Sequence, residues 1–222
     1  MNIADNLTEY LKEIGDRNCR LVAISKRKPV SDILEAYNAG HRIFGENKVQ
    51  ELVEKVDQLP EDIEWHMVGH LQTNKVKYIA PFVDLIHSVD SYKLLREINK
   101  QGMKHNRIIP CLLQVHIAQE ETKFGLSESE VTGLLEVVMS SELTNIKIVG
   151  LMGMATYTSD EDIIRSEFRQ LRKIFDSISL KFRHDLIDMK ELSIGMSGDY
   201  KIAMEEGSTM IRIGTGVFGA RN

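Results

Sequence analysis

The sequence predicts a single (β/α)8 TIM-type barrel preceded by one extra helix. Three observations carry this prediction: eight short apolar runs, helical segments between them, and a length that fits one domain. The chain has 222 residues, of which 42% are hydrophobic and 27% charged, which is enough to bury one core. Strands that alternate with helices pair in parallel and are covered on both faces, so they read as continuous apolar runs. We expect one domain over residues 1–222 and no second domain.

Each element has its own signal in the sequence. An opening helix is expected over residues 3–14, and apolar residues at spacings of three and four predict a long helix over 160–182, capped by Ser159. Ser127 and Glu130 have the spacing of a capping box before a helix at 131–139. A doubly wound open sheet fits less well, because no Gly-rich turn follows the first strand. The expected strands are residues 21–24, 41–44, 65–68, 85–87, 108–117, 146–154, 192–196 and 210–213.

Composition and charge disfavour several classes of function. The chain has 33 acidic residues against 28 Lys and Arg, a net charge of −5, and no basic tract, so we expect no nucleic-acid partner. No apolar run is long enough to span a membrane and the first residues do not resemble a signal peptide, so we expect a cytoplasmic protein with no membrane partner. Cys19 and Cys111 lack metal-type spacing. Nothing in the sequence marks a strong dimer interface, and we expect a monomer.

Lys26 is the sharpest candidate for chemistry. In a barrel of this class the active site lies at the carboxyl ends of the strands, and Lys26 follows the first apolar run. Burial there would disfavour the ammonium form and leave an amine able to form a Schiff base. The competing interpretation is a lysine that points into solvent. Lys123 is a second candidate, although Glu120 and Glu121 beside it favour a surface ion pair.

The turns after the last two expected strands predict a phosphate site. Ser197-Gly198 and Gly214-Thr215-Gly216 stand where barrels of this class commonly bind phosphate through backbone N–H groups and hydroxyls. Glycine allows the backbone to approach an anion closely. The alternative is that both are ordinary tight turns.

Arg212 alternates with Ile211 and Ile213, so we expect its side chain to point into the barrel. A buried cation needs partners, so Arg212 is either a structural cation or a donor to a ligand. Beside a pyridine nitrogen it would keep that nitrogen unprotonated.

Other catalytic arrangements are weak. His66 and His70 lie four apart but across a strand end, without an acidic partner, so we expect no metal site. No serine lies in a Gly-x-Ser-x-Gly elbow, which disfavours a serine hydrolase.

Six ordered stretches resemble the signature motifs of the pyridoxal phosphate homeostasis protein family, whose barrels belong to fold type III of the pyridoxal phosphate proteins. These are residues 21–26, 44–51, 65–75, 150–154, 193–200 and 212–219. Where family members usually have Ser-Lys-Thr-Lys-Pro, this chain has Arg27 in place of the threonine. The resemblance implies a Schiff base between pyridoxal 5'-phosphate and Lys26, phosphate binding by Ser197, Gly214 and Thr215, Arg212 facing the pyridine nitrogen, and Asn47 near the phenolic oxygen.

Three functions remain open at this point. The first is a carrier that holds pyridoxal 5'-phosphate for intracellular homeostasis of vitamin B6, has little or no catalysis of its own, and serves apo-enzymes that need the cofactor. The second is an amino-acid racemase, which needs acid–base groups on both faces of the substrate Cα. Related racemases supply the second face from an extra domain and a neighbouring subunit, and we expect no such domain here. The third is a metal-dependent or phosphosugar barrel enzyme without pyridoxal, which leaves Lys26 unexplained.

Overall fold

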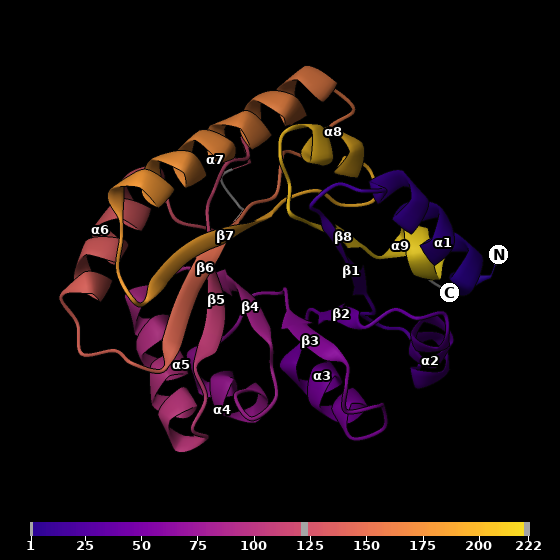
Figure 1. Ribbon diagram of the computed structural model, residues 1–222, viewed down its shortest axis with the longest axis horizontal. Coiled ribbons are helices and arrows are strands. Elements are labelled where there is room, and N and C mark those ends of the chain that lie inside the picture. Colours follow the sequence, from indigo (N-terminus) through magenta and orange to yellow (C-terminus); the bar gives the residue numbers. More distant parts are fainter. Residues whose placement is uncertain (1, 121–123, 220–222) are drawn as a thin grey trace.

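Eight parallel strands close into a barrel in the computed structural model, which describes residues 2–120 and 124–219 (Figure 1). Each strand pairs with the next along the chain, and β8 pairs with β1 to complete the ring. The predicted barrel is therefore confirmed and the open sheet is excluded. The strands are β1 (Arg20–Ile24), β2 (Ile43–Glu46), β3 (Glu64–Met67), β4 (Leu85–Val89), β5 (Ile109–Gln114), β6 (Ile146–Met152), β7 (Ile187–Ser193) and β8 (Met210–Ile213).

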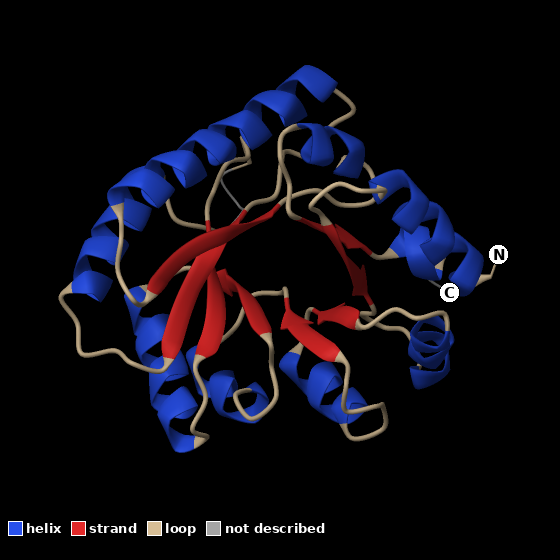
Figure 2. Cartoon of the chain, in the orientation of Figure 1, coloured by secondary structure: helices blue, strands red, loops and turns tan. Residues whose placement is uncertain are grey.

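The helices form an outer layer around the strands (Figure 2). The expected opening helix and the capping box are both present: Ser127 and Glu130 satisfy each other's backbone N–H groups at the start of α6. The helices are α1 (Ile3–Ile14), α2 (Val30–Asn38), α3 (Val49–Val56), α4 (Val76–Ile79), α5 (Tyr92–Lys104), α6 (Glu128–Met139), α7 (Glu161–Lys181), α8 (Tyr200–Glu205) and α9 (Thr215–Phe218), with a 3-10 turn, η1, at Thr73–Lys75.

Alternation along each strand divides the core into two parts. Successive side chains point to opposite faces of a strand, so one set packs beneath the helices and the other fills the barrel. Val22 of β1 and Met210 of β8 both belong to the cluster that fills the barrel, so the even-numbered residues of these two strands point inward. The register pairs Val22 with Arg212, which places Arg212 on the inner set. The inner apolar cluster consists of Val22, Ile24, Leu85, Leu112, Met152 and Met210.

Several expected element boundaries are wrong. β4 continues to Val89, β5 ends at Gln114 instead of residue 117, and β6 ends at Met152 instead of residue 154. Three further differences have a clear local cause. β2 extends to Glu46, a fully buried acid that the sequence pattern placed in the following turn. β7 begins at Ile187 and ends at Ser193, whereas the expected strand covered 192–196. The first half of β7 contains charged, partly exposed residues and no apolar run, so the sequence pattern did not mark it as a strand. The long helix α7 is capped by Asp160 and not by Ser159: the Asp160 carboxylate accepts hydrogen bonds from the N–H groups of residues 162 and 163.

In the part of the chain that the structure describes, no helix combines the length and the apolar character needed to cross a membrane.

Candidate functional site

Lys26 lies in the turn that follows β1, at the carboxyl end of the barrel. It is half-buried and lies two residues beyond Ile24, whose side chain belongs to the inner cluster. Arg27, the next residue, adopts a left-handed backbone conformation with φ of 61° and is exposed. The turn is closed by a hydrogen bond from the Lys28 N–H to the Ser25 carbonyl at 3.0 Å. Lys26 therefore begins a tight turn.

A buried ion-pair network holds this turn from outside the barrel. Lys55 of α3 donates to the Ser25 carbonyl at 2.8 Å, to Glu46 Oε1 at 2.6 Å and to Glu51 Oε1 at 2.7 Å. The Glu51 carboxylate also accepts a hydrogen bond from the Arg27 N–H, and the Ser25 hydroxyl donates to Glu46 Oε1 at 2.7 Å. The backbone on both sides of Lys26 is thus fixed to α3.

Burial has the largest effect on the pKa of Glu46, the most deeply buried acid of this network. Desolvation raises the pKa of Glu46, and the hydrogen bond and charge of Lys55 act against that rise. Glu46 Oε2 is buried and has no hydrogen-bond partner among the described residues. The pair is therefore held by one carboxylate oxygen.

The phosphate-site candidates meet across two loops. Ser197, after β7, and Thr215, after β8, bring their hydroxyl oxygens to 3.5 Å from each other. Gly214 lies beside the end of β1: a Cβ on it would be 3.5 Å from the Ile24 carbonyl oxygen. A Cβ on Gly198 would meet nothing within 4 Å. Two hydroxyls and an open stretch of backbone therefore lie next to the strand that carries Lys26.

The opening helix α1 supports this pair of loops. The Asn6 side chain donates to the Val217 carbonyl of α9 at 2.9 Å, and Figure 1 shows α1 and α9 side by side. Tyr10 packs so closely on α9 that a Cβ on Gly216 would lie 2.0 Å from the Tyr10 hydroxyl. Lys28 donates to the Phe218 carbonyl at 2.8 Å and joins the Lys26 turn to the same helix.

Arg212 lies inside the barrel, as expected, and is almost fully buried. Its Nη1 donates to the Ser193 carbonyl at 2.7 Å and to the Ser193 hydroxyl at 2.6 Å, and its Nη2 donates to the Gly153 carbonyl at 3.0 Å. Burial lowers the pKa of Arg212 to about 10, and the negative charge of Asp199 acts in the opposite direction. The guanidinium still carries its proton at neutral pH.

Asn47 follows β2, the strand next to β1. Ile24 pairs with Gly45 in the last pair of the β1–β2 ladder, and Lys26 and Asn47 each lie two residues beyond it. Gly69 lies against the Asn47 backbone, where a Cβ would be 2.2 Å from the Asn47 carbonyl oxygen. The Ser88 hydroxyl of β4 donates to the Gly69 carbonyl at 2.6 Å, so the turns after β2 and β3 pack against each other and against the end of β4.

The remaining candidates are Lys123 and the pair of His66 and His70. Lys123 lies outside the described residues. His66 and His70 do not meet: His66 is buried in β3, whereas His70 is largely exposed, with its Nδ1 3.5 Å from Asp90 Oδ2. Across residues 2–120 and 124–219, no group of three or more His, Cys, Asp and Glu side chains could hold a metal ion.

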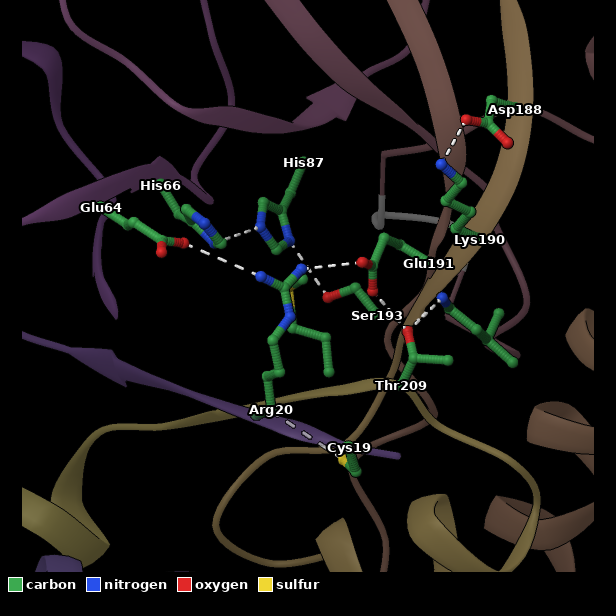
Figure 3. Close-up of polar contacts among 12 residues, drawn as sticks. Cys19, Arg20, Glu64, His66, His87, Asp188, Lys190, Glu191, Ser193 and Thr209 are labelled. Atoms are coloured by element: carbon green, nitrogen blue, oxygen red, sulfur yellow. Dashed lines mark hydrogen bonds and ion pairs between the residues drawn. The ribbon is translucent and has the colours of Figure 1, made fainter. Parts of the chain in front are cut away.

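Two sets of polar residues were missed by the sequence reasoning. The first is Glu46 with Lys55: Glu46 was expected in the turn after the second strand, and Lys55 was not singled out. The second lies inside the barrel, where His66, His87 and Ser193 form a chain of hydrogen bonds (Figure 3). The alternation that predicted the orientation of Arg212 could have found this second set, because all three residues lie on the inner parity of their strands.

The fold and the polar carboxyl end define a class of protein. The family described as "Alanine racemase, N-terminal domain" matches residues 1–222 and places the chain in the fold-type III class of barrels. Within that class the chain belongs to the pyridoxal phosphate homeostasis protein family. It is 38% identical over 231 aligned residues to the pyridoxal phosphate homeostasis protein of Aquifex aeolicus, covering 100% of this chain and 99% of that one.

Solved structures agree with this assignment. PipY from Synechococcus elongatus is 34% identical, and the alignments cover 98% of this chain and 100% of PipY. The TM-score is 0.90 for PipY without PLP and 0.87 for PipY with PLP bound. The alanine racemase of Bartonella henselae resembles the chain in fold alone, with 16% identity and a TM-score of 0.74 over 99% of this chain and 58% of the racemase.

Proposed function

We propose that this protein binds pyridoxal 5'-phosphate at the carboxyl end of the barrel, through a covalent Schiff-base link to Lys26, and acts in intracellular homeostasis of this cofactor. The observation that carries the proposal is the pairing of the Ser197 and Thr215 hydroxyls at 3.5 Å beside Gly214, next to the strand that ends at Lys26. The PLP-bound PipY structure, which is that of a 34% identical relative, supports it.

The side chains present fit a phosphorylated pyridine aldehyde. The two hydroxyls and the backbone of Gly214 offer hydrogen-bond donors for a phosphate group. Lys26 offers an amine at the carboxyl end of β1, and the network of Lys55 and Glu51 keeps its turn in place. Asn47, which lies as far beyond the last β1–β2 pair as Lys26 does, is assigned to the phenolic oxygen.

Arg212 is assigned to the pyridine nitrogen. A guanidinium has only N–H donors and no acceptor, so it can donate to the nitrogen but cannot protonate it at neutral pH. When bound, the cofactor supplies an aldehyde that forms imines with amines and a ring that withdraws electrons. An unprotonated ring withdraws electrons weakly. We therefore propose a carrier with little or no turnover of its own.

The biological setting follows from the same proposal. We propose a cytoplasmic monomer made of one domain over residues 1–222, whose partners are the cofactor and the apo-enzymes that require it. No nucleic-acid or membrane partner is part of the proposal, in line with the net charge of −5 and the lack of a basic tract.

The attachment is tested by incubating the purified protein with pyridoxal 5'-phosphate and recording its visible spectrum. Borohydride reduction and peptide mapping should then locate the added mass on Lys26. Lys26→Ala should lose the band and the label, whereas Lys123→Ala should keep both. A label on Lys123, or no absorption band at all, would overturn the assignment.

The absence of turnover is tested with single-enantiomer amino acids in deuterated water. A carrier should show only slow deuterium uptake at Cα. Sustained exchange or racemisation faster than about 1 per second would instead establish the racemase.

A further inference from the structure

Four polar side chains inside the barrel form one continuous chain of contacts. Arg212 Nη1 lies 2.6 Å from Ser193 Oγ, Ser193 Oγ lies 3.1 Å from His87 Nδ1, and His87 Nε2 lies 3.0 Å from His66 Nδ1. The four residues come from β8, β7, β4 and β3, and each is almost or fully buried. Figure 3 shows His66 and His87 edge to edge, with Ser193 on the far side of His87.

The direction of the hydrogen bonds in this chain follows from Arg212. A guanidinium has N–H donors and no acceptor, so Ser193 Oγ accepts the bond from Arg212. The one hydroxyl hydrogen of Ser193 then has a single remaining partner in the described part of the chain, His87 Nδ1. Because a buried hydroxyl hydrogen without an acceptor is energetically costly, we assign the hydrogen to this bond, with Nδ1 as the acceptor. A neutral imidazole carries one N–H, so His87 donates from Nε2 to His66 Nδ1. His66 consequently carries its hydrogen on Nε2.

Burial keeps both rings neutral, as this assignment requires. Desolvation lowers the pKa of His66 to about 3 and that of His87 well below its usual value. The charged groups that act on the pair have the same effect: Arg212 and Arg20 further lower the pKa of His87, and Arg20 lowers that of His66.

The chain ends at the opposite face of the barrel. His66 lines a cavity of about 210 Å³ at the amino-terminal ends of the strands. Arg20 lies there between Glu64 and Glu191, with its Nη2 2.8 Å from Glu191 Oε1 (Figure 3). His66 Nε2 has no hydrogen-bond partner among residues 2–120 and 124–219, so its N–H is available to this cavity.

We propose that Ser193, His87 and His66 are positioning residues that orient Arg212 toward the cofactor ring and stabilise its charged form through a one-directional hydrogen-bond chain. Each acceptor atom in the chain has its lone pair on the side that faces Arg212. The dipoles of the three side chains therefore point their negative ends toward the cation and stabilise it together. Hydrogen bonds in such a chain also polarise and strengthen one another. None of the three is assigned a contact with the cofactor. The role in tuning the ring rests on the proposed function, whereas the direction of the chain does not.

The direction is tested on the protein without cofactor. Long-range ¹H–¹⁵N spectra of the histidine side chains should show His66 and His87 as neutral Nε2–H tautomers that do not titrate between pH 5 and 8. An Nδ1–H tautomer at either residue, or titration within that window, would overturn the chain.

The effect on the cofactor is tested with Ser193→Ala and His87→Leu, which cut the chain without removing Arg212. Both should shift the absorption maximum of the bound cofactor and move the pH midpoint of its band by about half a unit or more, the size expected for one lost hydrogen bond. The matched control is His41→Leu, since His41 is also a buried histidine but bonds only the Ile43 carbonyl, outside the barrel interior. It should change neither value.

The two proposals fail in different ways. Chain-cutting variants that bind the cofactor with the spectrum and midpoint of the unmodified protein would refute the positioning role. If the unmodified protein forms no adduct at Lys26, the proposed function fails, and the histidine tautomers still decide whether the chain runs as described.

Discussion

Lys55 is a buried cation whose partners all belong to the Lys26 turn or to the elements beside it. Removing one partner of a buried ion pair leaves the other charge without compensation, which costs about 3 kcal/mol or more. We therefore expect Lys55→Met to lower the free energy of unfolding by about that amount, because Glu46 would stay buried without its main partner. Urea denaturation at pH 7 measures this.

A surface lysine provides the control. Lys190 lies 2.6 Å from Asp188 but is two-thirds exposed, so Lys190→Met should cost less than about 1 kcal/mol. The double variant Glu46→Gln/Lys55→Met should recover part of the loss, since position 46 then carries no unpaired charge and Glu51, the other acid bound by Lys55, is partly exposed. Equal losses at Lys55 and Lys190 would show that the buried network contributes nothing beyond an ordinary surface pair.

At the scale of single residues, the sequence predicted orientations better than partners. Position after an apolar run was sufficient to place Lys26 at the carboxyl end of the barrel, and alternation was sufficient to point Arg212 inward. The partners of Arg212, Ser193 and Gly153, lie 19 and 59 residues away, and only the closure of the barrel brings them together. Lys55 could not be chosen for the same reason, because its role depends on where α3 docks.

Among the elements, α1 and α9 form the contact that most directly supports the loops with Ser197 and Thr215, the candidate phosphate site. A Cβ at position 216 would lie 2.0 Å from the Tyr10 hydroxyl, so Gly216→Ala must move either Tyr10 or α9. We expect this variant to weaken cofactor binding about tenfold or more, because Thr215 is the first residue of α9. Titration of the visible absorption band measures the affinity.

Gly133→Ala is the matched control for this contact. It adds the same methyl group in α6, away from the two loops, where a Cβ meets nothing within 4 Å. Its effect on affinity should be small. If Gly216→Ala binds the cofactor as tightly as Gly133→Ala, α1 has no part in shaping the site.

Elements with a clear apolar periodicity or a capping motif were predicted well. β7, in which some residues are buried and others are partly exposed, was not. α1 and the start of α6 followed directly from periodicity and capping residues. β7 was misplaced because its first half lies partly exposed and carries Asp188, Lys190 and Glu191, so its burial pattern contains no apolar run. The pairing of β7 with β6, which keeps this half in the sheet, has no local signal in the sequence.

For the molecule as a whole, buried histidines predict sensitivity to acid. Burial lowers the pKa values of His41, His66 and His87 in the folded protein, whereas in the unfolded chain they titrate near 6.5. Below that pH the unfolded chain takes up protons that the folded protein does not, so stability falls by about 1.4 kcal/mol per pH unit for each such histidine. The contribution is complete above about pH 6.5 and is lost as the pH falls toward 3.

Protonation of Glu46 changes the free energy of unfolding in the opposite direction and so reduces this loss of stability at low pH. Its folded-state pKa is raised, so the folded protein takes up a proton there before the unfolded chain does, which offsets part of the fall. Unfolding at pH 7.5 and pH 5 should show the net decrease, and His87→Leu should show a smaller one. A stability that is constant between these pH values would contradict the burial of neutral histidines.

Closure of the barrel between β8 and β1 also has a consequence during synthesis. Lys26 is synthesised before Arg212, Gly214 and Thr215, and β1 has no β8 to pair with until those residues have emerged. A nascent chain that stops before β8 therefore has the lysine without the arginine and without half of the hydroxyl pair. Under the proposed function, cofactor capture should begin only once β8 has been made, so a chain that has not reached this strand does not withdraw the cofactor from the cell.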